Sequence, residues 1–349
     1  MKQDASKMTL PKSAMKELEK ALSSSVESFL SPEKLLPNVV GMGLGVKWTN
    51  GEPTGEPSLV VLVAQKVERD CLGSADRIPS KLAGMQTDVL AIGYPVAGND
   101  GPPAPAPQAL AKRVRPARGG YSVGHKDTTA GTIATCVYDI LPDGKIRPPA
   151  TGIGVPGKYY VLSNNHVLAN CNAGKVGDPI LQPGPYDGGS DPADRIATLS
   201  RFVPITFDPP VPRASHRNVV DAAIAEGQFH DLDRAIHWIG HIRGWRQKAN
   251  VTVGAVVQKT GRTTNYTIGR ITAISATVDV SYGSAGVARL QDQIVTTNIS
   301  AGGDSGSLVT SLDDVAVGLL FAGSSVATIA NQIENVRSLL RVEVAEEVL

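Results

Sequence analysis

The sequence has little of what marks secreted disulfide-rich proteins or membrane proteins. Only three cysteines occur in 349 residues, Cys71, Cys136 and Cys171, and they are too few and too scattered for a disulfide framework or a zinc ribbon. Apolar runs such as residues 59–64 fall far short of the ~20 residues that a membrane-spanning helix needs. No apolar segment follows the charged first residues as in a secretory signal. We therefore expect a soluble cytoplasmic protein without a membrane span.

The sequence also lacks an excess of charge and is poor in aromatic side chains. Lys and Arg number 34 against 33 Asp and Glu, so no chain-wide field would attract nucleic acid or an anionic membrane. Aromatic residues make up only 5%, whereas 36 glycines and 24 prolines are present. This composition favours many turns and short strands, and we expect no nucleic-acid partner.

The first 100 residues are predicted to form a small α/β domain that serves regulation or assembly. Apolar residues recur at helical spacing from Leu10 to Phe29, which predicts an amphipathic helix. The apolar runs 38–46 and 59–63, separated by Asn-Gly and Thr-Gly turn signals, predict a β-hairpin. The glycines of the first run lack G-x-G-x-x-G spacing and precede no helix start, so they predict a glycine-rich strand rather than a nucleotide site.

Residues 101–120 are predicted to be a linker, and residues 121–349 a second domain. The linker holds four prolines followed by a basic cluster, and such a stiff stretch should hold the N-terminal domain away from the rest. Many short β-type runs follow, which predict a mainly β double barrel closed by a helix near residues 333–340. The predicted strands are 131–138, 159–163, 196–205, 251–258, 268–276, 293–297, 307–310 and 315–321.

Ser305 is the candidate nucleophile. It lies in the string GGDSGS, after a predicted strand and before the apolar Leu308 and Val309. A nucleophilic serine needs a tight loop that projects its Oγ and turns backbone N–H groups toward one point, and flanking glycines allow that loop. A Gly-Asp-Ser-Gly string also occurs in ordinary turns. The assignment therefore depends on its partners.

A serine hydroxyl needs a base, and a histidine suits that role at neutral pH. His166 follows a β-rich apolar run that ends in polar residues, where a strand delivers a side chain to a cleft. Asp221 lies inside an apolar run, where an unpaired carboxylate is costly, so it needs a histidine or an arginine as partner. His237 and His241 have the i, i+4 spacing of some zinc sites, but the motif lacks the usual Glu. We expect no metal and no cofactor.

His166, Asp221 and Ser305 occur in the order His, Asp, Ser. The strings LSNNHV, NVVDAAIA, GGDSGS and VGLLFAG resemble trypsin- and chymotrypsin-like serine proteases over about residues 120–323. The strings NVVGMGLGVKW, EPSLVVLVAQK, RPARGGYSVGH, ILQPG and QKTGRTT look closest to the narrow-leaf-like branch of plant and bacterial proteins. An α/β-hydrolase esterase is excluded because its histidine comes after its serine in the chain.

The resemblance implies a chymotrypsin-like fold and an intracellular serine endopeptidase that acts on a protein or peptide substrate. Ser305 would attack the peptide carbonyl, His166 would act as general base and then general acid, and Asp221 would orient His166. The backbone N–H groups of Gly303 and Ser305 would form the oxyanion hole.

The resemblance also implies where the substrate pocket lies. Ile299 occupies the position at which trypsin-type enzymes carry the acid that binds Lys or Arg, so no strict basic preference is expected. Phe321 and Gly323 match the strand edge that pairs with substrate, with Gly323 at the pocket mouth. These residues favour an apolar or medium-sized P1 side chain.

Activation is expected to differ from that of the secreted proteases, in which a new N-terminus pairs with the acid before the nucleophile, here Asp304. Because a whole domain precedes the barrels, we expect either a built-in partner for Asp304 or gating by a ligand or by assembly into a homo-oligomer. Asn165, where secreted relatives have a small residue, supports an alternative, a catalytically weak regulatory or scaffold protein. Pairing of Cys136 with Cys171 is left open.

Overall fold

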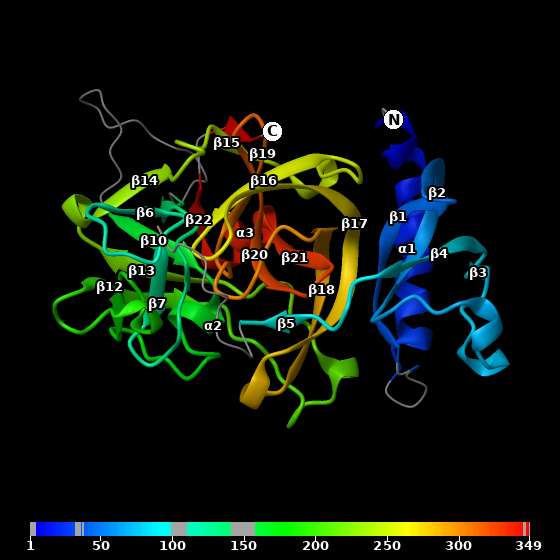
Figure 1. The fold of residues 1–349 in the computed structure, drawn as a ribbon, viewed down its shortest axis with the longest axis horizontal. Helices are drawn as coiled ribbons and strands as arrows, with labels where there is room; N and C mark the ends of the chain where they lie inside the picture. Colours follow the sequence, from blue (N-terminus) through cyan, green and yellow to red (C-terminus); the bar gives the residue numbers. More distant parts are fainter. Residues whose placement is uncertain are drawn as a thin grey trace.

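The computed structural model describes residues 5–31, 36, 38–98, 110–140, 158–344 and 347–348. In these residues the chain forms an N-terminal α/β layer and two β-barrels (Figure 1). The prediction of a mainly β double barrel is confirmed. Residues 101–109 of the predicted linker lie outside the described residues. The rest of that segment runs along the first barrel, with Leu110 and Ala117 buried.

The N-terminal layer contains the predicted helix and hairpin. The apolar face of its helix packs against the hairpin and contributes Leu18 and Leu22 to the core. The two hairpin strands are antiparallel, and the second is also paired in parallel with a later strand. The elements of this layer are α1 (Lys12–Phe29), β1 (Val39–Thr49), β2 (Glu52–Val63), β3 (Lys81–Leu82) and β4 (Met85–Ala91).

This layer is joined directly to the barrels, which corrects the expectation that the proline-rich stretch holds it away. Strand β1 pairs antiparallel with β17 (Asn265–Ser281), for example Gly41 with Val278. A Cβ at Gly41 would clash with the carbonyl of Thr277, so the glycines of β1 permit this close approach. One hydrophobic core includes residues of α1, β1, β2 and the second barrel.

Six antiparallel strands form the second barrel. Each strand pairs with the next one in the barrel order given below, and the last strand, β17, also pairs with the first, β16, which closes the barrel. In barrel order the strands are β16 (Val256–Gly261), β19 (Leu308–Ser311), β20 (Val315–Gly323), β21 (Ala327–Gln332), β18 (Val287–Thr297) and β17. The predicted C-terminal helix is α3 (Ile333–Leu340).

The first barrel is less regular. The predicted strand 131–138 is divided in two, because residues 133–135 bend so that Ile133 bonds to Tyr121 and Ala134 to Leu162. This bend closes the barrel. Its strands are β7 (Ser122–His125), β8 (Gly131–Thr132), β9 (Cys136–Asp139), β10 (Tyr159–Ser163), β11 (Pro179–Leu181), β12 (Arg195–Phe202) and β13 (Ala223–Gly227). The remaining elements are β5 (Val96–Ala97), β6 (Ala117–Gly119), α2 (Asn165–Leu168), β14 (Leu232–Ile236), β15 (Gly244–Trp245), β22 (Val342–Glu343) and β23 (Glu347–Val348).

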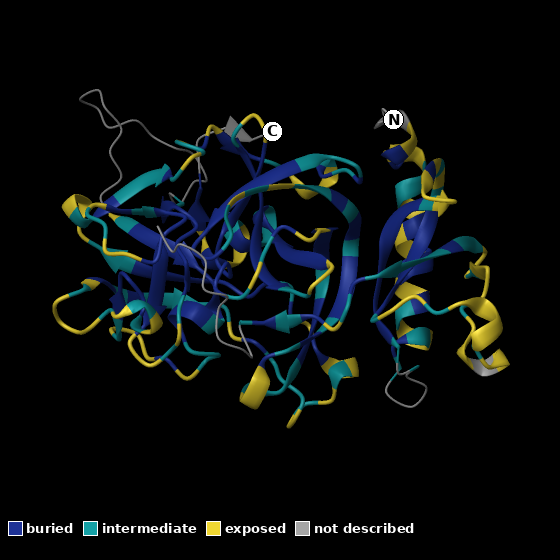
Figure 2. Cartoon of the chain, viewed as in Figure 1, coloured by how far each residue is buried: buried dark blue, intermediate teal, exposed yellow. Residues whose placement is uncertain are grey.

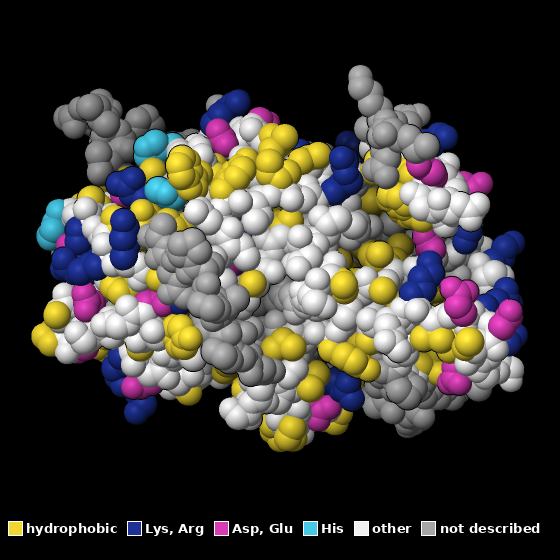
Figure 3. Space-filling model, in the orientation of Figure 1, with side chains coloured by type: hydrophobic (Ala, Val, Ile, Leu, Met, Phe, Trp, Pro, Cys, Tyr) yellow, Lys and Arg dark blue, Asp and Glu magenta, His cyan; other side chains and the backbone are white. Residues whose placement is uncertain are grey.

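The barrel strands are buried over most of their length, whereas the connecting loops are exposed (Figure 2). Acidic and basic side chains are interspersed on the face drawn in Figure 3. Among the described helices, none combines the length and the hydropathy that crossing a bilayer requires.

Candidate active site

The first barrel brings His166 and Asp221 together. Strand β10 ends at Ser163, and His166 lies in the short helix α2 just beyond it, not in a strand. Asp221 lies just before β13, and the antiparallel pairing of Ser163 with Ala223 places it beside that helix. The Nδ1 atom of His166 is 2.6 Å from Oδ2 of Asp221, and the His166 backbone N–H donates to Oδ1 at 3.2 Å.

The Asp221 carboxylate is fully buried and held from several sides. The Tyr282 hydroxyl donates to Oδ2 at 3.1 Å, and burial raises the pKa of Tyr282 well above its usual value, so it stays a donor. Asn331 accepts the Asp221 backbone N–H at 3.1 Å, and Asn164 donates to the Asp221 carbonyl at 2.8 Å. The partners of this acid are therefore His166 and Tyr282, not an arginine.

Ser305 lies in a tight loop of the second barrel that is fastened to both barrels. Gly303 and Gly306 have φ of 94° and 95°, a region that favours glycine. The backbone N–H of Thr132, in the first barrel, donates to the Ser305 carbonyl at 2.7 Å, and its hydroxyl donates to the Gly303 carbonyl at 2.8 Å. The loop conformation is thus fixed by contacts between the barrels.

The hydroxyl of Ser305 and the ring of His166 are not hydrogen-bonded to each other. Ser305 Oγ donates to the Phe321 carbonyl at 3.4 Å. His166 Nε2 is buried and has no hydrogen-bond partner among the described residues. Within the same residues the N–H groups of Gly303 and Ser305 donate to nothing. Catalytic hydrogen bonds are often long before substrate binds, and the loop N–H groups are available as donors to an incoming oxygen.

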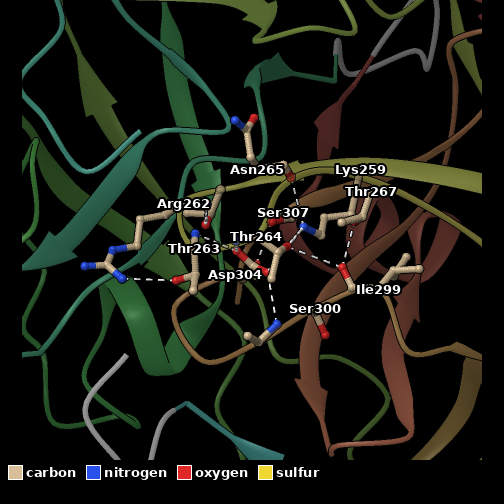
Figure 4. A network of polar contacts seen from close by, with 12 residues as sticks. Lys259, Arg262, Thr263, Thr264, Asn265, Thr267, Ile299, Ser300, Asp304 and Ser307 are labelled. Atoms are coloured by element: carbon tan, nitrogen blue, oxygen red, sulfur yellow. Dashed lines mark hydrogen bonds and ion pairs between the residues drawn. The ribbon is translucent and has the colours of Figure 1, made fainter. Parts of the chain in front are cut away.

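Asp304 has the built-in partner that was expected as one alternative. Lys259 Nζ, on β16, is 3.2 Å from Oδ2, and both side chains are fully buried (Figure 4). The N–H groups of Thr263, Thr264 and Ala301 donate to the same carboxylate at 2.8, 3.1 and 3.0 Å. Burial lowers the pKa of Lys259, although the Asp304 charge favours the ammonium. This network fixes the residue directly before Ser305.

A second buried cation, Arg262, connects this network to the first barrel. Its Nε donates to Asp187 at 2.8 Å, and the Ser122 hydroxyl donates to the same carboxylate at 2.5 Å. Its Nη1 donates to Thr263 at 3.0 Å, next to the Asp304 network (Figure 4). Neither Lys259 nor Arg262 is given a role by the sequence alone. A signal is present, because both cations closely follow an apolar run. Such a position predicts that they are buried, and a buried cation needs an anionic partner.

Asn165 has a structural explanation. Its Nδ2 donates to Asn172 at 2.7 Å and to the Val203 carbonyl at 2.8 Å, and its Oδ1 accepts the Asn172 N–H at 2.9 Å. The Asn165 amide thereby closes the turn after α2, and its hydrogen bonds go to this turn and to Val203 rather than to Asp221 or Ser305. Cys136 and Cys171 are free thiols, and burial raises the pKa of each to about 12.

A cleft of about 530 Å³ opens beside Ser305. Gly323 lines it, together with Ser300, Ala301 and Gly302. The prediction for Ile299 and Phe321 needs correction, because their side chains are buried in hydrophobic cores and do not line the cleft. Phe321 contributes its backbone carbonyl instead. The described lining residues are Gly93, Tyr94, Val96, Gly98, Asn298, Ser300, Ala301, Gly302, Ser305, Leu320, Ala322, Gly323, Ser324 and Ser325.

No protein-family model and no curated protein matches this chain. Its fold is similar to those of solved trypsin- and chymotrypsin-like serine proteases. Thermobifida fusca protease A is 15% identical with a TM-score of 0.43, and the match covers 65% of this chain and 96% of that one. A Nocardiopsis protease is 18% identical with a TM-score of 0.43, covering 65% and 97%. Cellulomonas bogoriensis chymotrypsin is 16% identical with a TM-score of 0.41, covering 65% and 96%.

Proposed function

We propose that the protein is a serine endopeptidase that hydrolyses peptide bonds through Ser305, His166 and Asp221. The observation that carries the proposal is the buried pair of His166 Nδ1 and Asp221 Oδ2, which leaves the Nε2 atom of His166 without a partner among the described residues. A neutral imidazole held in this way has its proton on Nδ1 and a free lone pair on Nε2. In the proposal, His166 Nε2 is the base, and the Ser305 hydroxyl is the group that donates a proton to it.

In the proposed reaction, Ser305 Oγ attacks the carbonyl carbon of the scissile bond while its proton passes to His166 Nε2. The carbonyl oxygen becomes an oxyanion and accepts hydrogen bonds from the N–H groups of Gly303 and Ser305. His166 then gives its proton to the leaving amine as the C–N bond breaks, which forms an acyl-enzyme. Water, deprotonated by His166, attacks the carbonyl carbon of this ester. The resulting tetrahedral intermediate collapses by breaking the bond to Ser305 Oγ, and His166 returns the proton to Ser305 as the acid product is released.

We propose a neutral P1 side chain for the substrate. None of the described lining residues of the cleft carries a charged side chain. Small residues such as Gly302 and Gly323 leave room at its mouth. A charged P1 group would lose its hydration there without gaining a described ionic partner.

The narrow-leaf-like branch and a cytoplasmic location remain parts of this proposal. The strings quoted for the branch include β1 and the segment with Lys259 and Arg262, the positions that connect the barrels to the N-terminal layer and to the Ser305 loop. The three cysteines are free, which suits a reducing compartment. Because Lys259 already pairs with Asp304, a new N-terminus is not needed to order this loop. Gating by assembly or a ligand would act on access to the cleft.

One observation favours the second candidate, a regulatory protease-fold protein with little turnover. Ser305 Oγ donates to Phe321 and not to His166. In such a protein the cleft would bind a partner without cleaving it. Replacement of Ser305 by alanine would then leave the biological effect intact.

Intact-mass analysis after treatment with a fluorophosphonate probe tests the proposal without knowledge of the substrate. We expect one adduct per chain, located at Ser305 and absent from Ser305→Ala. Asp221→Asn is the matched control, since the corresponding change in a serine protease with the same triad lowers turnover by about 10⁴ while keeping the geometry. Absence of any adduct in the wild-type chain would refute the proposed hydrolase and favour the binding protein.

A further inference from the structure

Strand β5 lies on the edge of β20 that adjoins the nucleophile. Ala97 pairs antiparallel with Ala322, and Val96 pairs with Gly323. On its other side, Val96 pairs in parallel with Ser281 of β17. Figure 1 shows β5 beside the lower part of the second barrel, far along the chain from β20. The end of β20 therefore already has an extended neighbour, supplied by the chain itself.

The segment 93–98, which contains β5, also runs along the cleft toward the catalytic histidine. Gly93, Tyr94, Val96 and Gly98 line the same cleft as Ser305. At the end of the segment, a Cβ on Gly98 would be 3.8 Å from Cδ2 of the His166 ring. The segment thus follows a path from the β20 edge to the triad.

That path is where an extended peptide substrate would have to lie. A strand edge offers unpaired N–H and C=O groups to an extended peptide. Phe321 accepts the Ser305 hydroxyl through its carbonyl, so the residues just after it, Ala322 and Gly323, are the part of the edge nearest the nucleophile. These two residues are the ones paired with β5. A peptide and β5 cannot pair with them at the same time.

We propose that residues 93–98 are an intramolecular pseudo-substrate, which holds the peptide-binding edge in the resting chain and must leave before a substrate binds. This inference rests on the proposed function. Besides the pairing of Val96 and Ala97, the segment is held by the Gly93 N–H, which donates to the Ala64 carbonyl at 3.1 Å, and by the Ser281 N–H, which donates to the Pro95 carbonyl at 3.1 Å. Directly before it, Ser324 Oγ donates to the Ile92 carbonyl at 2.5 Å. A two-residue strand held in this way can be displaced by a competing peptide. The apparent affinity of that peptide equals its affinity for the open edge multiplied by the fraction of chains whose edge is open.

A reversible disulfide tests the proposal in a folded chain. Ala97 and Ala322 are paired across the two strands, and both are buried in the same apolar cluster. The double variant Ala97→Cys/Ala322→Cys therefore places two small apolar side chains opposite each other, where they can form a disulfide. Cys71 is exposed and is replaced by Ser in this background. Burial raises the pKa of Cys136 and Cys171 to about 12, so these thiols stay unreactive. Oxidation then tethers β5, and reduction releases it. Each single cysteine variant is a matched control.

The readout that needs no catalysis is binding of a fluorescent peptide, Gly-Tyr-Pro-Val-Ala-Gly, to the Ser305→Ala version of these variants. We expect the reduced double variant to bind at least about 10-fold more tightly than the oxidised one. Ala97→Asp, which places a charge in the apolar cluster and so expels β5, should bind more tightly still. Equal affinity in all three, or no binding in any, would overturn the pseudo-substrate.

The proposed function is tested separately in the same background with Ser305 retained. Fluorophosphonate labelling of Ser305 in the reduced chain supports the triad, whatever the peptide affinities are. If peptide binding follows the tether but no adduct forms, the pseudo-substrate stands and the endopeptidase fails. If an adduct forms but the tether changes no affinity, the endopeptidase stands and the pseudo-substrate fails.

Discussion

Lys259 and Asp304 form an ion pair in which neither side chain has any solvent exposure, with Nζ 3.2 Å from Oδ2. Asp304 directly precedes Ser305, so this pair determines where the backbone of Ser305 lies. The remaining lone pairs of the carboxylate are used by backbone N–H groups and by the Thr264 hydroxyl at 2.6 Å. The pair therefore fixes the loop that carries Ser305 from within the chain itself.

Removal of the Lys259 charge should loosen the loop. In Lys259→Met the buried Asp304 loses its cation, and we expect a loss of about 3–5 kcal/mol in the free energy of unfolding, measured by denaturant titration. Fluorophosphonate labelling of Ser305 should slow in parallel. The double variant Lys259→Met/Asp304→Asn removes both charges and should regain most of the stability but not the labelling rate. Full labelling of Lys259→Met would contradict the role of this pair.

Gly306→Ala should damage the junction of the two barrels. A Cβ there would clash with the Ser163 hydroxyl and the Thr132 carbonyl, and its φ is 95°. The matched control is Gly188→Ala, because Gly188 has φ of 88° but no atom within 4 Å of the added carbon. We expect about 1–2 kcal/mol for the control, from the left-handed backbone alone. Crowding should add about 1–3 kcal/mol at Gly306 and slow the labelling of Ser305. Equal costs would show that no contact between the barrels is involved.

Tyr282→Phe separates a positioning role from a packing role. The Tyr282 hydroxyl is one of the donors to Asp221 Oδ2, and its loss leaves the ring in place. With this donor removed, Asp221 Oδ2 keeps, among the described residues, only its contact with His166 Nδ1, so the carboxylate that positions the His166 ring is held less firmly. The rate at the optimum should fall by about 10-fold, as for one lost hydrogen bond to a charged group. An unchanged labelling rate would mean that the tyrosine only packs.

Stability should fall on the alkaline side because of buried thiols. Burial raises the pKa of Cys136 to about 12, whereas a thiol in the unfolded chain ionises near its ordinary value of 9.0. Between these values the folded chain binds more protons than the unfolded one, so stability decreases as pH rises, by about 1.4 kcal/mol per pH unit for one thiol. Cys136→Ala should therefore have a shallower decline from pH 9 to 12, read from denaturant titrations. Exposed Cys71→Ser should leave the slope unchanged, and equal slopes in all three chains would contradict the account.

The parts of the fold that the sequence predicted are those set by local pattern. The helical spacing of Leu18 and Leu22 identified α1, and the turn signals near Asn50 identified the β1–β2 hairpin. His166, Asp221 and Ser305 are recognisable as candidates because each stands in a short distinctive string. The pairing of His166 with Asp221 follows from the register of β10 against β13.

The parts that were missed depend on residues far apart in the chain. Nothing in the string around Lys259 names Asp304 as its partner, and nothing in residues 93–98 indicates pairing with β20. The proline-rich stretch suggested separation of the N-terminal layer, but the register of β1 on β17 decides otherwise. The family resemblance alone places Ile299 and Phe321 at the pocket. Their side chains instead pack into the barrel cores.

Peptide cleavage is the most direct test of the central claim that this site hydrolyses peptide bonds. The wild-type chain, Ala97→Asp and Ser305→Ala are each incubated with a library of unstructured peptides, and new N-termini are quantified by mass spectrometry. We predict new termini after uncharged residues with wild type, more of them with Ala97→Asp, and none with Ser305→Ala. Identical termini at equal rates in all three, or no cleavage by chains whose Ser305 reacts with the fluorophosphonate, would contradict an endopeptidase.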